Sequence, residues 1–486
     1  MTSETNRRPR SVTRRALLGG AAALAGGCLV ALGYLASRPG GAIVPGRSRA
    51  RGIETPSSLP AKVDVVVLGG GNVGCLTALA LAERGVKVAL CEKGVIAGEA
   101  SGRSLGFIDS LFLDPVKMEI VARSKRLWEN MNARIAGETG YRRVGTAALF
   151  PNHAAVEFGQ AWLGSVQGVS EFDGRILGAR EAAEVAFGSA DKLAGALYIP
   201  SDGSAEPQLA APAVAESVLR LGGIVLQNCA VRGLETAGGT VAGVITEKGP
   251  IACSAVALAG GVWSPIFLRS LGVDLPQFMA FGSALRFATA PGPVTALVSM
   301  QRGLVMRRGL TGSYDACRPV ASTPITPSAV KNAFRLRTAL ENMWDELEPV
   351  LNVSTFLSFL QIPSYWPLDR PSPFEAHRIL VPETRTDMLD DVAREMQAAF
   401  PQIGGGSVIE RWAGAMMSTL DNMPVISAVP AVPGLYVASG FYYGLTMGPA
   451  AGEALADLVT GRKPQIDLKL YRLSRFSDGT PIKFRA

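Results

Sequence analysis

The chain has 486 residues, of which 48% are hydrophobic and 18% are charged, a composition typical of a globular protein with two or three domains. Its formal net charge is +7, but residues 1–60 contain nine arginines and two glutamates, so the whole excess lies in this segment. The remainder of the chain is electrically balanced. This distribution of charge excludes a general electrostatic basis for binding nucleic acid.

The first 38 residues are typical of a targeting segment. A basic region precedes an apolar run from Ala16 to Leu35, and Thr13–Leu18 (TRRALL) resembles a twin-arginine export signal. About 20 apolar residues can also span a bilayer, so an uncleaved membrane anchor is the alternative. We therefore expect a protein that passes through the export machinery and is either periplasmic, or otherwise extracytoplasmic, or anchored to the cytoplasmic membrane. Residues 39–60, rich in Gly, Pro, Arg and Ser, are predicted to be a linker.

Metal-ligating residues are scarce. The chain has two histidines, and the five cysteines beyond the targeting segment show no metal-ligand spacing. No metal site is predicted, and two histidines give little basis for a Ser-His catalytic triad.

Three consecutive elements near residue 70 predict a βαβ unit. Val63–Leu68 is an apolar run broken only by Asp64, which predicts a strand buried on both faces. Leu76–Arg84 has an apolar helical pattern, and Val86–Cys91 is a second short strand-like run. A glycine-rich turn joins the first strand to the helix.

The glycines of this turn have the spacing G-x-G-x-x-G, at Gly69, Gly71 and Gly74. Gly69 permits a tight turn, Gly71 allows the backbone to approach a pyrophosphate, and Gly74 allows helix and strand to pack closely. The helix N-terminus stabilises negative charge. Glu92, at the end of the second strand, can accept hydrogen bonds from ribose hydroxyl groups. This pattern predicts a dinucleotide site, but NAD and FAD both satisfy it.

A second glycine pattern lies near the C-terminus. Leu435–Ala438 is predicted to be a short strand, and Gly440, Gly444 and Gly448 lead into a helix predicted from Pro449 to Thr460. Glycines before a helix and a proline near its start expose backbone N–H groups.

Four stretches together resemble the D-amino-acid-oxidase-type FAD-dependent oxidoreductases, which include glycine and sarcosine oxidases and D-amino-acid dehydrogenases. The resemblance spans roughly Val63 to Arg475, with Leu310–Arg370 the least similar part. The four stretches are EKGVIAGEASGRSLGFI, LAGALYIPSDGSAEPQLAAPAVAESVLRLGGIVLQNCAVRGLET, IACSAVALAGGVWSPIFLRSLGV and RWAGAMMSTLDNMPVISAVPAVPGLYVASGFYYGLTMGPAAGEALADLVTG.

The resemblance implies FAD, held non-covalently, and the C-terminal stretch disfavours an NAD-dependent dehydrogenase. In the family, the loop after the second strand contacts the flavin, and the C-terminal glycines face the flavin pyrimidine. The implied cofactor-binding residues are Gly69, Gly71, Asn72, Val73, Gly74, Glu92, Lys93, Ser101, Arg103, Ser104, Val231, Gly260, Trp263, Gly440, Gly444, Leu445, Thr446 and Met447.

The stretches lie far apart in the chain, so we predict an α/β fold with a discontinuous Rossmann-like FAD-binding domain at residues 61–142, 206–274 and 410–475. Residues 143–205 and 275–409 are predicted to form a second, mainly antiparallel-sheet domain for the substrate, with the ligand between the two domains. Expected elements of the second domain are strands at Leu285–Phe287, Ala296–Met300 and Leu304–Arg308 and helices at Lys331–Leu347 and Met388–Phe400.

The resemblance implies an enzyme that oxidises the C–N bond of an amine or amino acid by hydride transfer to flavin. Water then hydrolyses the imine. The protein needs no strong base if the amine is already neutral when the hydride leaves. Alternatives are an FAD-dependent 2-hydroxy-acid dehydrogenase or oxidase and a non-catalytic flavin-binding subunit. The electron acceptor is left open between oxygen, a quinone and another carrier.

One departure from the family concerns substrate binding. Relatives often place an arginine four residues after the tryptophan equivalent to Trp412, but this chain has Met416. Arg307 and Arg308 are the substitute candidates for binding a substrate carboxylate. Since neighbouring strand residues face opposite ways, we expect one of the two to point inward.

Three tyrosines are further candidates for the substrate pocket. Tyr442 and Tyr443 lie beside the C-terminal flavin loop, where a Met- and Tyr-lined pocket favours a bulky or apolar amine. Tyr314 follows the strand that carries the two arginines. Packing in the protein core, or an ordinary sheet surface for Tyr314, is the alternative role.

Overall fold

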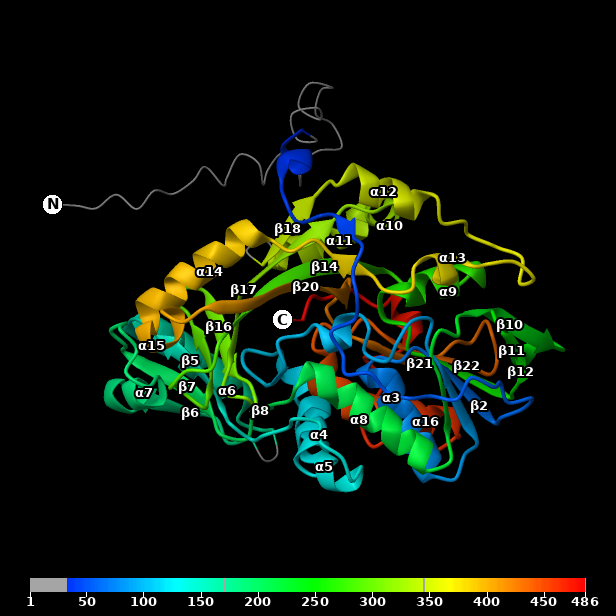
Figure 1. Ribbon diagram of the computed structural model, residues 1–486, viewed down its shortest axis with the longest axis horizontal. Coiled ribbons are helices and arrows are strands. Elements are labelled where there is room, and N and C mark those ends of the chain that lie inside the picture. The colour runs from blue at the N-terminus through cyan, green and yellow to red at the C-terminus, as the bar shows by residue number, and fades with distance from the viewer. Residues whose placement is uncertain (1–32, 170–171, 344–345, 486) are drawn as a thin grey trace.

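The computed structural model describes residues 33–169, 172–343 and 346–485 (Figure 1). Most of the predicted targeting segment, residues 1–32, lies outside the described residues. Within the described ranges, no helix combines the length and apolar character needed to cross a membrane.

A six-stranded sheet forms the centre of the first domain, and its strands are parallel except for one edge strand. Most of its residues are buried because helices cover one face and a smaller sheet covers the other. In spatial order the strands are β21 (Val425–Ala428), β22 (Leu435–Ser439), β13 (Ala255–Leu258), β2 (Val65–Leu68), β3 (Val88–Cys91) and β9 (Ile224–Leu226).

The helical layer of this domain lies together at the lower side of Figure 1, where α3 packs between α16 and α8, and α16 also contacts α4. A three-stranded antiparallel sheet and α9 belong to the core on the other face. The helices are α3 (Asn72–Glu83), α4 (Met118–Glu129), α5 (Met131–Arg134), α8 (Pro207–Arg220), α9 (Ser264–Ser270) and α16 (Gly444–Val459). The small sheet comprises β10 (Val231–Ala237), β11 (Thr240–Thr246) and β12 (Gly249–Ala252).

A nine-stranded sheet forms the second domain, and only two of its strand pairs, β5–β15 and β17–β18, are parallel. The predicted fold class, a Rossmann-like domain with a mainly antiparallel second sheet, is therefore confirmed. The spatial order is β20 (Val408–Thr419), β14 (Gln277–Phe287), β17 (Tyr314–Pro324), β16 (Leu304–Arg308), β15 (Ala296–Ser299), β5 (Thr146–Phe150), β7 (Gly195–Ile199) and β6 (Arg175–Gly178), with β18 (Leu347–Val350) paired to β17.

Most of the remaining helices pack around this second sheet, and one short helix, Pro373–Ala376, instead packs through Phe374 against the core that contains α9. They are α6 (His153–Val166), α7 (Ala179–Val185), α10 (Pro327–Lys331), α11 (Ala333–Asn342), α12 (Val353–Leu360), α13 (Pro373–Ala376), α14 (Thr386–Ala399) and α15 (Pro401–Gly404). Two short ribbons complete the fold, β1 (Ile43–Val44) with β19 (Val381–Pro382) and β4 (Phe107–Ile108) with β8 (Gly203–Ser204).

Several boundaries differ from the sequence-based expectations, among them those of two helices and one domain. α16 begins at Gly444, five residues before Pro449, because burial of Leu445–Met447 outweighs the poor helix propensity of its glycines. The helix expected over Lys331–Leu347 ends at Asn342. The expected domain boundary at 409/410 falls inside β20, which pairs with β14 along its whole length and so belongs to the second sheet.

The segment expected to be a linker packs along the protein. β1 pairs with β19, and the amide of Arg51 donates to the carbonyl of Gln208 at 2.9 Å. Arg49 binds Glu410 of β20 through two hydrogen bonds of 2.7 Å. This segment therefore contacts both the first domain, at α8, and the second sheet, at β20.

Candidate functional site

The turn between β2 and α3 presents backbone amides at the edge of the six-stranded sheet. Gly69 has φ = +109°, which residues with a side chain rarely adopt. A Cβ on Gly74 would lie 1.9 Å from the carbonyl oxygen of Gly69, so glycine is required there. The N-cap, Gly71, has no side chain, and the amide of Asn72 donates to Ser101 Oγ at 2.9 Å. The first turn of α3, which includes Val73, thus offers the positive end of a helix dipole.

Glu92 follows β3 and faces this turn. Its Oε2 accepts from the amide of Gly70 and its Oε1 from the amide of Gly94, each at 2.7 Å. Burial raises the pKa of Glu92, while the charge of Lys93 and the two amides oppose that rise. The two bonds hold the carboxylate beside the glycine turn.

A hollow of about 820 Å³, counting its open mouth, lies over the turn. Its walls come from the glycine turn, the loop after β3, the segment after β13 and two residues of β20, Ala415 and Met417. Eight of the predicted cofactor residues line it: Gly69, Gly71, Glu92, Lys93, Ser101, Val231, Gly260 and Trp263. The hollow therefore joins the first domain to the edge of the second sheet.

Trp263 closes one side of the hollow. Lys93 Nζ lies 4.6 Å from the centre of its ring, and His377 stacks on it with ring centroids 5.5 Å apart. The indole N–H donates to the carboxylate of Glu99, which also accepts from Lys93 at 2.6 Å. These contacts fix the orientation of the ring.

The predicted flavin loop contains buried polar atoms that no described residue satisfies. Arg103 donates from its two Nη atoms to the carbonyls of Ala413 and Arg47, but its Nε and the Ser104 hydroxyl have no hydrogen-bond partner in the described structure. Buried polar atoms are normally paired. A Cβ on Gly414 of β20 would lie 2.9 Å from Arg103 Cβ. These two donors without partners lie in a loop next to Gly414, a strand position with no side chain. They fit the binding of a polar cofactor such as FAD.

The C-terminal cofactor residues lie next to this loop rather than in the hollow. Gly440 has φ = +81°, and Gly444, Leu445, Thr446 and Met447 form the first turn of α16. Thr446 Oγ1 accepts from the amide of Asp109 at 3.3 Å and donates to the carbonyl of Phe107 at 3.4 Å. The N-terminus of α16 therefore faces the loop that carries Arg103.

Asp109 is a residue of this region that sequence analysis did not identify as a candidate site residue. Burial, helped by the negative charge of Asp202, raises the pKa of Asp109 to about 7. Asp202 itself pairs with Lys125 at 2.7 Å. Only the tertiary structure brings these acids together, because their strands β4 and β8 pair over a separation of almost 100 residues.

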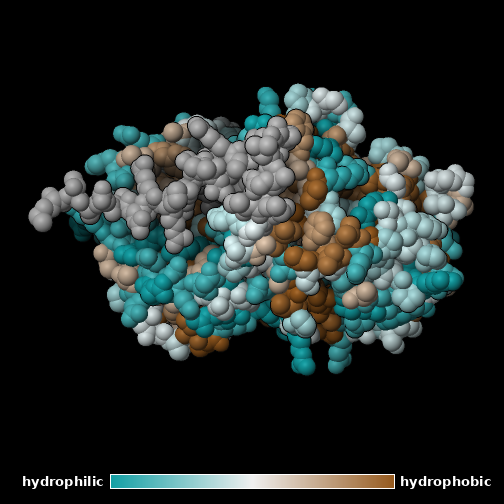
Figure 2. Space-filling model, turned by 90° about the horizontal axis from the view of Figure 1, so that it is seen from above, coloured by the Kyte–Doolittle hydropathy of each residue, from teal (hydrophilic) through white to brown (hydrophobic). Residues whose placement is uncertain are grey.

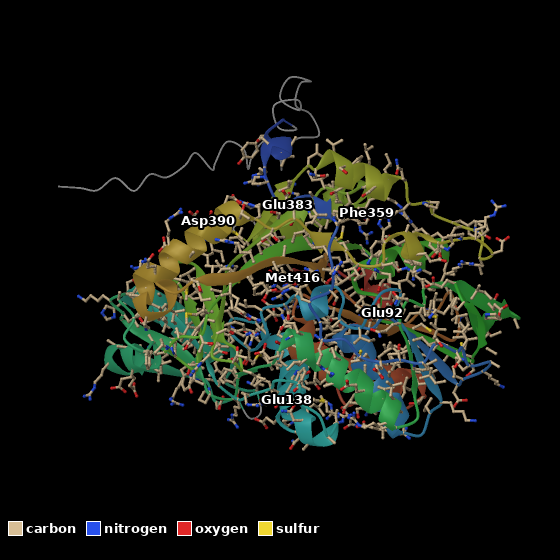
Figure 3. The ribbon with its side chains drawn as sticks, viewed as in Figure 1. Glu92, Glu138, Phe359, Glu383, Asp390 and Met416 are labelled. Atoms are coloured by element: carbon tan, nitrogen blue, oxygen red, sulfur yellow. The ribbon has the colours of Figure 1, made fainter. Side chains whose placement is uncertain are left out.

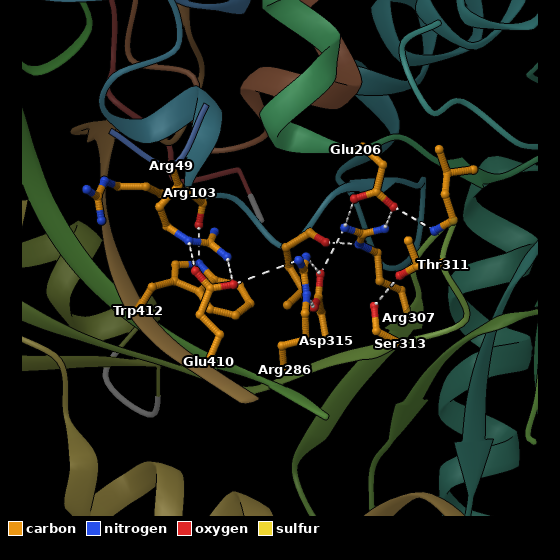
Figure 4. Close-up of polar contacts among 12 residues, drawn as sticks. Arg49, Arg103, Glu206, Arg286, Arg307, Thr311, Ser313, Asp315, Glu410 and Trp412 are labelled. Carbon is orange, nitrogen blue, oxygen red and sulfur yellow. Dashed lines mark hydrogen bonds and ion pairs between the residues drawn. The ribbon is translucent and has the colours of Figure 1, made fainter. Parts of the chain in front are cut away.

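A row of alternating charges crosses the second sheet beside the same loop (Figure 4). Arg307 on β16 lies opposite Asp315 on β17. Asp315 also lies opposite Arg286 on β14, which lies opposite Glu410 on β20. Directly opposite residues share one face of a sheet. With a neighbour at each end, this charge row consists of Glu206, Arg307, Asp315, Arg286, Glu410 and Arg49.

The row determines the position of both predicted carboxylate binders. Arg307 is 1% exposed, and its guanidinium pairs with Glu206 at 3.0 and 3.1 Å and with Asp315 at 2.9 Å. Arg308 is half-buried and, as the next residue along β16, faces the other side of the sheet. As expected, one of the two arginines, Arg307, points inward and the other points outward. The carboxylates of Glu206 and Asp315, however, already pair with Arg307.

The three candidate tyrosines pack into cores. Tyr314 is fully buried and donates its hydroxyl to the carbonyl of Pro293 at 3.0 Å. Tyr442 and Tyr443 are half-buried with ring centroids 5.1 Å apart, and Lys117 Nζ lies 5.5 Å from the Tyr443 ring. Burial raises the pKa of each tyrosine. Tyr314 is therefore a core residue, and not the ordinary sheet-surface residue that was its alternative role.

Met416 stands where relatives often have arginine. It lies on β20, and Figure 3 labels it together with Glu92, which follows β3. A Cβ on Gly282 of β14 would lie 3.1 Å from Met416 Cε, so its thioether covers a glycine on the neighbouring strand. This part of the sheet face is apolar.

Comparison with known proteins identifies the family. Residues 64–458 match the family model described as FAD dependent oxidoreductase. The chain belongs to this family. It is 26% identical to a glycine oxidase of Pseudomonas putida over 84% of this chain and 97% of the relative.

Solved structures of this family include two that match almost the whole fold. The L-amino acid deaminase of Proteus myxofaciens, solved with anthranilate, is 35% identical, with a TM-score of 0.87 over 91% of this chain and 100% of the other. The L-amino acid deaminase of Proteus vulgaris is 31% identical, with a TM-score of 0.83 over 87% and 100%. The predicted family and the reaction class, FAD-dependent oxidation of an amine or amino acid, are confirmed.

Proposed function

We propose that this protein is an exported deaminase that holds FAD non-covalently and releases ammonia from an amino compound. The observation that carries the proposal is the 35% identity, over 91% of the chain, to an L-amino acid deaminase. FAD, when bound, accepts a hydride from the carbon that bears the nitrogen. The nitrogen loses a proton, and water hydrolyses the resulting imine to a carbonyl compound and ammonia.

The contacts available to FAD support non-covalent binding. The amides at the start of α3 bind the diphosphate, and Glu92 binds a ribose hydroxyl. Arg103 Nε and the Ser104 hydroxyl, which lack partners in the described structure, donate to the cofactor. The N-terminus of α16 would stabilise negative charge on the reduced cofactor.

Two measurements test this proposal. The purified protein is expected to be yellow, and heat denaturation is expected to release all of its FAD into the supernatant. Anaerobic mixing with panels of amines, amino acids and 2-hydroxy acids is expected to bleach the oxidised flavin only with the nitrogen compounds. Colour that stays with the precipitate contradicts non-covalent binding. Bleaching by hydroxy acids, or by no compound, contradicts the deaminase assignment.

The proposed place of action is the outer side of the cytoplasmic membrane. The short helix at residues 33–37 is held beside the segment before α12, where the amide of Leu351 donates to the carbonyl of Leu35. The surface of α10–α12 and the residues that follow is unusually apolar, and Figure 2 shows hydrophobic side chains gathered on this upper face. The exposed residues are Val330, Phe334, Val353, Leu357, Leu360 and Tyr365. This face supports membrane association, and the reduced flavin would pass its electrons to a quinone, oxygen or another carrier.

Export is tested by changing the second arginine pair, Arg14→Lys with Arg15→Lys. The wild-type chain is expected in the membrane fraction and the variant in the cytoplasm, because the twin-arginine pathway requires the pair. Immunoblots of fractionated cells measure the distribution. The matched control is Arg7→Lys with Arg8→Lys, which preserves the signal pair. Equal export of both variants contradicts the assignment.

A further inference from the structure

A short segment at residues 47–50, here named the strap, lies against the predicted flavin loop. It precedes residues 64–458, the part of the chain that the family model matches. Its composition predicted a flexible linker, which would make few fixed contacts. The structure shows instead a segment that is bonded to both domains, so its role goes beyond connection.

The flavin loop lies between the strap and the cofactor hollow. Ser101 of the loop lines the hollow. At the next residue, a Cβ on Gly102 would lie 3.4 Å from Ala50 Cβ, so the loop packs directly on the strap. The main-chain carbonyl of Arg47 accepts from an Nη of Arg103. The strap therefore supports the loop from behind, and none of its own residues lines the hollow.

Arg49 fastens the strap to the second sheet. Its guanidinium lies 3.8 Å from the ring centre of Trp412 on β20 and pairs with both oxygens of Glu410 at 2.7 Å (Figure 4). A guanidinium that is both stacked and paired at two points is held in one orientation. The same side chain reaches the loop, because its Nη1 donates to the carbonyl of Gly102 at 3.4 Å. It is only 10% exposed, so solvent screens the pairing little.

Arg103 joins the strap to the cofactor site. Its two Nη groups donate to the carbonyls of Arg47 and Ala413, and its Nε, which is buried and has no partner among the described residues, is the donor that the proposed function assigns to FAD. Burial and the neighbouring charge of Arg49 lower the pKa of Arg103. The negative charge of FAD opposes both effects. Binding of FAD and seating of the strap therefore favour each other.

We propose that the strap holds the flavin loop closed on bound FAD, and that Arg49 is the positioning residue that fixes the strap. The inference rests on the proposed function for the contact between Arg103 and FAD, and it goes beyond that function by giving a role to a segment outside the matched family region. Coupling between two sites is reciprocal. FAD therefore holds the strap down by the same factor by which the strap retains FAD.

The first test measures the rate of FAD release, from the rise in FAD fluorescence after high dilution of holoenzyme. Arg49→Gln removes the charge and the two-point pairing, and is expected to release FAD at least about tenfold faster. The matched control is Arg51→Gln, at the residue after the strap. Arg51 pairs with Glu216 at 2.7 Å, but the two side chains are 41% and 35% exposed. This control is expected to stay within about twofold of wild type.

Melting temperatures separate a positioning role from a purely structural one. A ligand that binds only the folded state raises the melting temperature, and the rise depends on its affinity. Arg49→Gln is expected to reduce the rise that FAD produces, whereas Arg51→Gln leaves it unchanged. A residue that only stabilises the fold would lower the melting temperatures of apoprotein and holoenzyme equally.

The second test uses the wild-type chain alone. Trypsin is expected to cleave after Arg49 at least about tenfold faster in apoprotein than in holoenzyme, because coupling of FAD to the strap is reciprocal. Mass spectrometry identifies the cleavage sites. Cleavage after Arg180 on α7, whose side chain is 93% exposed, is the internal control. It is expected to proceed at the same rate in both forms.

Three results would overturn the inference: equal FAD release by wild type and Arg49→Gln, an unchanged FAD-induced rise in the melting temperature of this variant, or equal cleavage after Arg49 with and without FAD. If Arg49→Gln does not fold, the cleavage experiment on the wild-type chain decides. If no amine or amino acid reduces the flavin, the deaminase assignment fails. The inference is still decided in that case, because these tests measure FAD binding and not turnover.

Discussion

Gly74→Ala is expected to abolish stable FAD binding. The added Cβ would lie 1.9 Å from the carbonyl oxygen of Gly69 and 3.0 Å from its carbonyl carbon, both backbone atoms that no rotamer change can move. Overpacking of this kind costs about 1–3 kcal/mol or more, and here the strain falls on the turn proposed to bind the diphosphate. We expect purified protein with less than about a tenth of the wild-type FAD content, since each 1.4 kcal/mol is tenfold in affinity. Flavin absorbance measures this.

Gly164→Ala is the matched control for that substitution. Gly164 also lies within a helix, α6, but nothing lies within 4 Å of the position of its Cβ. Replacing an unstrained helical glycine by alanine stabilises a protein by about 0.5–1 kcal/mol. The control is expected to keep its FAD and melt at the wild-type temperature or above. Normal FAD content in Gly74→Ala would show that the α3 turn does not limit cofactor binding.

Arg307→Met is expected to lower the free energy of unfolding by about 3–5 kcal/mol at neutral pH, because it leaves buried carboxylates without their cation. Methionine preserves most of the apolar volume, so loss of charge dominates. Urea unfolding measures the change. The matched control is Arg180→Met, which breaks an exposed pair with Glu184 whose side chains are 93% and 66% exposed. Such surface pairs contribute about 0–1 kcal/mol.

The loss of unfolding free energy in Arg307→Met should become smaller as the pH falls. Burial alone would raise the pKa of Glu206, but the hydrogen bonds and charge of Arg307 and the amide of Leu310 hold it below its usual range. A carboxylate with a lowered pKa contributes stability above its unfolded pKa of about 4.3 and loses it as the pH falls. Without Arg307, burial dominates, and the penalty disappears when Glu206 is protonated. The difference between wild type and variant should therefore shrink toward pH 4, and a difference that stays constant would contradict this account.

The sequence alone determined the family and the glycine turn at which we predict that the cofactor binds. Gly69 and Gly74 are required by backbone geometry within six residues of each other, so their spacing already specifies a turn that only glycine permits. The buried strands β2 and β3 follow from short apolar runs, and Glu92 follows from its place at the end of the second. Local sterics and patterning decide these features, and both are visible in a single stretch of chain.

The tertiary structure decided the availability of Arg307. Arg307 and Arg308 face opposite sides because they are neighbours on a strand, which is a local property. The acids that pair with Arg307 are brought to it by contacts outside its own strand. Asp315 is aligned by the register of β16 on β17, and Glu206 comes from the start of α8, 101 residues away. Arg49, from a segment that composition marks as a linker, pairs with Glu410 across 361 residues. Strand register and distant loop placement fix which charges meet, and no short-range pattern encodes them.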